Sequence, residues 1–205
     1  MEKENKKPLI SSDLLKASLI FIVSYIIFLV LWLGIKGYYG MVITTAASHV
    51  MALLKDLDIV SIVRNKDLVS VGFIPRKYGV TILKTTIDVP ISNYTFNAPL
   101  TFSIMAAFIP FLKRKWIYLE AILILILVHF LFVFSLEGER LSAALHTQGY
   151  AKSGTTSQIF WEFLWGFLDN MVVRFEPFLI GAYLFFFRYH RSPEKETKKK
   201  GNKRK

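Results

Sequence analysis

Long apolar runs alternate with short polar and basic segments along this chain. A helix that crosses a lipid bilayer takes about 20 mostly apolar residues, and four runs approach or reach that length. The first of them, "ASLIFIVSYIIFLVLWLGI", carries no charge at all. The pattern predicts an α-helical membrane protein with four transmembrane helices. The expected spans are residues 17–35, 98–112, 116–135 and 170–187.

The Lys and Arg residues that flank these spans predict an orientation. They precede the first span, form "KRK" at 113–115 and crowd the segment after the fourth span, whereas the two longer connections are nearly balanced in charge. Loops with an excess of Lys and Arg stay in the cytoplasm. We therefore expect the termini (1–16 and 188–205) and the 113–115 turn to be cytoplasmic, and 36–97 and 136–169 to face outward. The second outward connection should be part helix and part flexible loop.

The first outward connection changes its pattern midway. Residues 38–54 show the period of an amphipathic helix, with Thr44, Ser48 and Lys55 in one polar row and apolar residues on the other face. Such a helix lies on the outer leaflet or packs on the protein. Residues 57–91 are instead rich in β-branched residues with a period of two, interrupted by the turn-like "RNKD" and "PRKYG". We predict a small β-rich insertion, a three-stranded antiparallel meander, after this helix.

Composition agrees with a membrane protein and narrows its chemistry. The 205 residues are 53% hydrophobic, with 18 Phe, yet the formal net charge is +11. A soluble nucleic-acid-binding protein can be this basic, but it would not also carry several long uncharged runs, so we expect no nucleic-acid partner. The absence of Cys excludes disulfides, thiolate metal ligands and a cysteine nucleophile. The polar tail "RSPEKETKKKGNKRK" should be disordered and attracted to anionic lipid.

The fourth apolar segment contains charged residues that need an explanation. If residues 158–187 form one continuous helix, the seven-residue spacing of Glu162, Asp169 and Glu176 places the three carboxyls on one face. Arg174 can extend its charged end outward along the helix. Glu176 cannot do so easily, and we expect it to point into the bundle and find a donor there.

Pro177 makes this position more polar still. It has no N–H, so the carbonyl of Val173 loses its helical partner, and a polar notch results. The notch is either a plug between helices or a docking site for a partner's membrane segment or a peptide. His129, deep in the third span, is either hydrogen-bonded across the bundle or functional, and Asn97 is expected to cap the second span. The candidate partner-binding residues are Arg174, Glu176, Asp169, Glu162 and His129.

Catalytic and metal-binding signatures do not accompany these residues. The sequence contains no Gly-rich phosphate loop, no G-x-S-x-G and no H-E-x-x-H, and no His pair has metal-ligand spacing. We therefore expect no enzyme activity, no catalytic residue, no cofactor and no metal. A membrane hydrolase that uses the outward carboxylates is the least favoured possibility.

The order of features resembles the exosortase H-associated membrane proteins. An N-terminal span is followed by an outward β-like region, then by "NAPLTFSIMAA", a polar loop and the Pro-containing "FEPFLIGAYLFFF". The resemblance implies a non-enzymatic accessory or scaffold subunit of a protein-sorting or assembly complex in the cell envelope, set in the bacterial inner membrane beside an exosortase-like partner. The alternative is a small transporter or channel-like subunit whose polar path uses Glu176, Arg174 and His129.

Overall fold

The chain folds mainly into helices, with one small sheet after the first helix. A computed structural model describes residues 12–76, 84–112, 115–147 and 155–190, and the expectations for the N-terminal segment and the basic tail lie largely outside these residues. In chain order the elements are α1 (Ser12–Lys55), β1 (Leu57–Asn65), β2 (Leu68–Pro75), β3 (Thr85–Pro90), α2 (Ile91–Thr95), α3 (Ala98–Phe108), α4 (Trp116–Thr147), α5 (Thr155–Phe167), the π-helical segment η1 (Leu168–Val173) and α6 (Arg174–His190).

Three helical segments are long and apolar enough to cross a membrane. They are Leu14–Lys55, Trp116–Thr147 and Thr155–Phe187. The expected second span, 98–112, is only partly helical: α3 has 11 residues, which is about 16 Å of helix against a hydrocarbon core of about 30 Å. Conversely, α4 continues past its expected end at residue 135 to Thr147. The sequence thus predicted a helical protein with membrane-spanning lengths, but not where these helices end.

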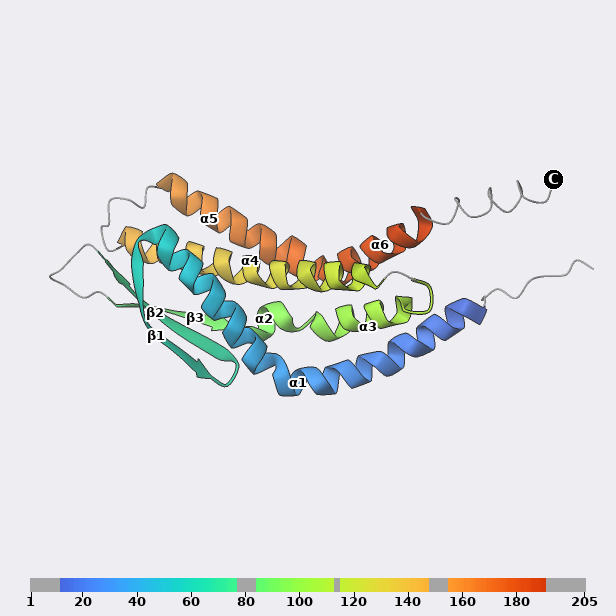
Figure 1. Cartoon of the computed structure of the whole chain (residues 1–205). Coiled ribbons are helices and arrows are strands. Elements are labelled where there is room, and N and C mark those ends of the chain that lie inside the picture. The colour runs from blue at the N-terminus through green and yellow to red at the C-terminus, as the bar shows by residue number, and fades with distance from the viewer. Residues whose placement is uncertain (1–11, 77–83, 113–114, 148–154, 191–205) are drawn as a thin grey trace, which may run out of the picture.

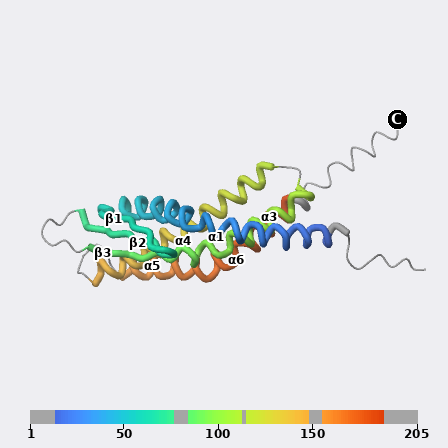
Figure 2. The backbone as a smooth tube through the Cα atoms, turned by 90° about the horizontal axis from the view of Figure 1, so that it is seen from below, coloured from blue at the N-terminus to red at the C-terminus, as the bar shows by residue number. Residues whose placement is uncertain are grey.

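The molecule is elongated and has two ends of different character (Figure 1). At one, which we call the bundle end, the first half of α1, α3, the first half of α4 and α6 run side by side. The start of α1, the α3–α4 connection and the end of α6 all lie there. At the other, the sheet end, the three strands lie beside the second half of α1 and the end of α4, and α5 packs against α4. Figure 2 shows the same division from a direction 90° away.

The predicted meander is confirmed as a three-stranded antiparallel sheet in the order β1-β2-β3. Alternate residues of the central and third strands point into the core: Val69, Val71 and Phe73 of β2, and Ile87 and Val89 of β3, are all buried. Val71 pairs with both Ile62 and Ile87. The period of two in the sequence therefore identified the buried face correctly, because one face of this sheet is covered by helices.

The expected amphipathic helix at 38–54 is not a separate element. It continues the first span within the 44-residue α1, which bends along its length (Figure 1). It packs on the protein, but its polar row faces inward: Thr44 and Ser48 are buried, whereas Val42 and Leu53 are exposed. The polar row faces inward because the interior next to it contains the buried Glu137 carboxyl, to which Ser48 donates at 2.5 Å.

A small polar network fixes the turn between β1 and β2 against the helices. The Lys36 ammonium donates to the Asp67 carboxylate (2.9 Å) and to the Ser92 hydroxyl (3.0 Å). Partial burial raises the pKa of Asp67, but the hydrogen bonds from Ser92 and Lys36 outweigh it and hold that pKa below its usual value. The network joins α1, the sheet and α2, and so positions the residues that follow Ser92.

Candidate functional site: a buried polar cluster behind a surface cleft

The helix that carries most of the predicted site residues changes its winding in the middle. Between α5 and α6, residues 168–173 form a π-helical segment, which has more residues per turn than an α-helix. Glu162 is exposed, Asp169 half-buried and Glu176 buried. The expectation that these three carboxyls share one face required a continuous α-helix over residues 158–187, and the π-helical segment interrupts that helix.

The carbonyl that Pro177 leaves without its usual donor is bound from another helix. Pro177 lies inside α6, and the side-chain amide of Asn97 donates to the Val173 carbonyl at 2.7 Å. Asn97 occupies the N-cap position of α3, but its side chain makes no capping hydrogen bond. The expected N-cap position is therefore confirmed, but the side chain donates to the buried carbonyl across the interface and does not cap the helix.

Glu176 and His129, two of the predicted site residues, meet in the core of the bundle end. Glu176 Oε2 lies 2.9 Å from His129 Nε2, and both side chains are almost completely buried, at 1% and 0% exposure. The two atoms are not aligned as a hydrogen bond, so this is a close polar contact. Thr101 donates to the other carboxylate oxygen at 2.8 Å, and the Tyr39 hydroxyl lies 2.7 Å from His129 Nδ1.

This buried cluster, which we define as Tyr39, Thr101, His129 and Glu176, takes one side chain from each helix of the bundle end. They belong to α1, α3, α4 and α6 respectively. The inward direction of Glu176 and the hydrogen bonding of His129 across the bundle agree with the sequence. Tyr39 and Thr101 were not anticipated, because nothing in the spacing of a lone hydroxyl residue within an apolar run indicates which helix it will meet.

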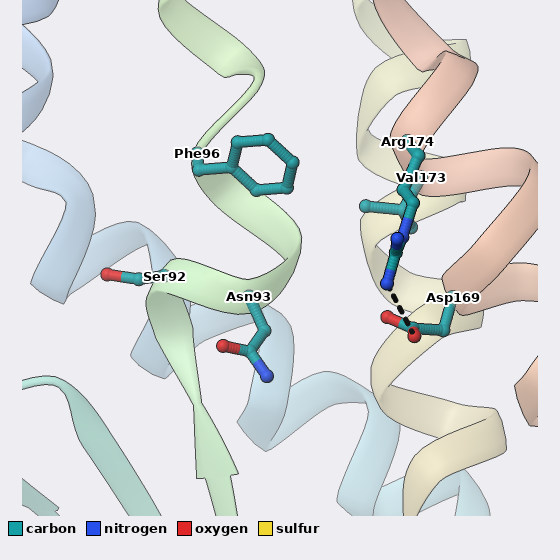
Figure 3. A pocket seen from close by; sticks show the side chains of 6 residues that line it. All are labelled: Ser92, Asn93, Phe96, Asp169, Val173 and Arg174. Atoms are coloured by element: carbon teal, nitrogen blue, oxygen red, sulfur yellow. Dashed lines mark ion pairs between the residues drawn. The ribbon is translucent and has the colours of Figure 1, made fainter.

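Arg174 and Asp169 line a cleft on the surface next to the buried cluster (Figure 3). The cleft has a volume of about 430 Å³ and is lined by Ser92, Asn93, Phe96, Asp169, Val173 and Arg174. Arg174 is largely exposed, and its guanidinium lies 3.8 Å from the Asp169 carboxylate. Val173 belongs to the wall of the cleft, while its carbonyl is held by Asn97 from within.

A second buried carboxyl, Glu137, lies at the sheet end and was missed. One of its oxygens accepts from Ser48 (2.5 Å), and the other has no hydrogen-bond partner among the described residues. Residue 137 falls in the 136–169 connection that was expected to face outward, where a carboxylate is ordinary.

Glu162 belongs to neither the buried cluster nor the cleft and is exposed on α5. Around it, Ile159, Phe160, Phe163 and Phe167 are exposed. We call these four apolar residues the α5 face. Five predicted site residues thus fall into three places: a buried pair, a cleft pair and one carboxylate beside the α5 face.

The chemistry available at these places is polar binding and structural pairing. In the part of the chain that the structure describes, no three His, Cys, Asp or Glu side chains come together as they would around a metal ion. Comparisons with protein-family models, with curated proteins and with solved structures give no significant match.

Proposed function

We propose that this chain is a non-enzymatic accessory subunit of a membrane protein complex, and that it docks a larger integral membrane partner through the α5 face. The observation that carries the proposal is the exposure of four large apolar side chains on α5, of which Phe163 is 70% exposed. Contiguous exposed apolar patches of this kind mark protein or membrane contacts.

The placement of the bilayer decides between those two kinds of contact. We place the bilayer around the bundle end, where residues 17–35, 98–112, 116–135 and 170–187 form four crossings with both termini and the 113–115 turn in the cytoplasm. The second crossing is then a short helix extended by irregular backbone, which membranes tolerate where neighbouring helices bury it. In this placement α5 and the sheet stand outside the hydrocarbon core.

The α5 face then meets water unless a protein covers it. Aromatic side chains are enriched at the centres of protein interfaces, where they contribute most of the binding energy. The exposed Glu162 at the edge of the α5 face is suited to the polar rim of such an interface. The buried cluster supports this role from within, since it joins α6, which follows α5 through η1, to α1, α3 and α4.

The resemblance to the exosortase H-associated membrane proteins supplies the first partner to test, an exosortase-like enzyme of the bacterial inner membrane. In such a complex this chain would contribute binding surface and the partner would contribute the chemistry. The basic tail would add attraction to anionic lipid on the cytoplasmic side.

Site-specific photo-crosslinking in membranes tests the docking surface. A photoreactive residue at position 163 should give one crosslinked product that contains a multi-spanning membrane protein. In a separate co-purification experiment, the variant Phe163→Ser should no longer retain that protein. Leu53 is the matched control, because it is equally exposed (74%) on the outer part of α1. Crosslinking from position 53 but not from 163 would move the interface to α1 and overturn the proposal.

The alternative function, a small transporter or channel-like subunit, draws on the buried His129–Glu176 pair, since carboxylates and histidines inside membrane bundles form proton relays. A proton-flux measurement distinguishes the transporter from the accessory subunit. Proton flux into liposomes that falls with Glu176→Gln while partner co-purification stays intact supports the transporter. Absence of flux in the wild type supports the accessory subunit.

A further inference from the structure

The cleft beside η1 combines features that the docking function does not use. Figure 3 shows Asn93 and Phe96 on one wall and Asp169, Val173 and Arg174 on the other, whereas the Ser92 hydroxyl points away from the opening. That hydroxyl is engaged with Asp67. The cleft therefore presents a guanidinium, a carboxylate and an amide beside an exposed aromatic ring, and its volume of about 430 Å³ lies in the range of small-ligand sites.

Arg174 is available to a ligand. Its side chain is 61% exposed, and the 3.8 Å to Asp169 is too long for a hydrogen bond. The planar guanidinium of Arg offers paired donors that fit the oxygens of a phosphate group. Asn93, exposed on the opposite wall, adds a neutral donor.

Asp169 determines which charges a ligand in the cleft must carry. A purely anionic ligand at Arg174 would also feel the Asp169 carboxylate, whose nearest oxygen is 3.8 Å from the guanidinium. A ligand with a phosphate and an ammonium group a few bonds apart satisfies both side chains at once. Primary ammonium groups can also donate several hydrogen bonds to a carboxylate.

The surface beyond the cleft is apolar. Phe178 and Phe185 follow Arg174 by four and eleven residues, so they lie on nearly the same face of α6, and both are exposed, as is Phe96 at the rim. A ligand with a polar head in the cleft can therefore lay hydrocarbon chains along α6 toward the bundle end.

We propose that this cleft binds the headgroup of an amine-headed glycerophospholipid, such as phosphatidylethanolamine. Arg174 and Asn93 hold the phosphate, Asp169 holds the ammonium, and the acyl chains follow Phe178 and Phe185. The site shares only the placement of the bilayer with the docking function, because the cleft does not include the α5 face.

Native mass spectrometry of the full chain in detergent, titrated with phosphatidylethanolamine, phosphatidylcholine and phosphatidylglycerol, tests the proposal. The wild type should retain phosphatidylethanolamine most tightly. Arg174→Gln should weaken its binding at least about tenfold, which is the loss expected for one charge-assisted contact. Asp169→Asn should remove the preference over phosphatidylglycerol without removing binding. Lys16→Gln, which changes an exposed cation outside the cleft, should bind as the wild type does.

Three outcomes would overturn the assignment: equal retention of the three lipids by the wild type, wild-type binding by Arg174→Gln, or a preference for phosphatidylethanolamine over phosphatidylglycerol that Asp169→Asn leaves unchanged. Partner crosslinking from position 163 reports on the docking function in the same samples. Loss of lipid preference with intact crosslinking would therefore reject the lipid site alone.

Discussion

The two buried carboxyls show how differently the two ends of the molecule are stabilised. At the bundle end, Thr101 donates to one oxygen of Glu176 at 2.8 Å, and the other oxygen makes no hydrogen bond among the described residues but lies 2.9 Å from His129 Nε2. At the sheet end, Glu137 has Ser48 on one oxygen, and its other oxygen has no hydrogen-bond partner among the described residues. A buried carboxylate needs a charged or hydrogen-bonding partner to offset lost hydration. The polar contacts thus hold helices together at the bundle end.

Close packing takes that role at the sheet end. Gly138, the residue after Glu137, faces the ring of Trp161 so closely that a Cβ atom there would overlap it. The Lys55 ammonium lies 5.1 Å from the centre of the same ring and donates to Ser142 at 2.7 Å. The sheet end is therefore held by the fit of α1, α4 and α5 around Trp161, with Glu137 enclosed among them.

The largest effect is expected from breaking the buried pair at the bundle end. His129→Leu leaves the buried Glu176 carboxyl without its His129 partner, and should lower the free energy of unfolding by about 3–5 kcal/mol, the range for removing one member of a buried pair. The double variant His129→Leu/Glu176→Leu removes both polar groups and should recover most of that loss. Thermal or denaturant unfolding in detergent measures both. Equal destabilisation of the single and double variants would show that the pair is not what joins these helices.

The packing at the sheet end should respond to a single added methyl group. Gly138→Ala forces α4 and α5 apart around the rigid Trp161 ring, and should cost about 1–3 kcal/mol. Gly166→Ala is the matched control, since a Cβ there meets nothing within 4 Å. It should be neutral or stabilise by up to about 1 kcal/mol through helix propensity. Similar results for the two variants would contradict the packing account.

The smallest expected change in stability is that of Glu137→Gln, and its comparison with Glu176→Gln distinguishes the two buried carboxyls. In Glu137→Gln the amide oxygen can still accept from Ser48, so stability should change by less than about 1 kcal/mol. Glu176→Gln alters the contact with His129 as well as the one with Thr101 and should cost about 1.5–3 kcal/mol. The same unfolding assay compares them. A larger loss for Glu137→Gln would mean that an unrecognised group pairs with Glu137 and would reverse the comparison.

Several features followed from sequence because they depend on local periodicity. The alternation through Val69, Val71 and Phe73 gave the buried face of the sheet, and the long uncharged run of residues 17–35 gave a helix of spanning length. The inward direction of Glu176 followed from the cost of exposing a carboxylate to hydrocarbon. In each case the residue's own neighbours in the chain carry the information.

Other features depend on contacts between distant segments, and only the tertiary structure decided them. The π-helical segment at 168–173 interrupts the continuous helix that a shared face of Glu162 and Glu176 required. Ser48 donates to the buried Glu137, and the polar row of α1 therefore faces the protein interior and not the solvent. Helical periodicity fixes which face of one helix a side chain occupies, but not which side chain of another helix it meets. That pairing follows from how the helices pack, and it brought His129 to Glu176 and Asn97 to the Val173 carbonyl.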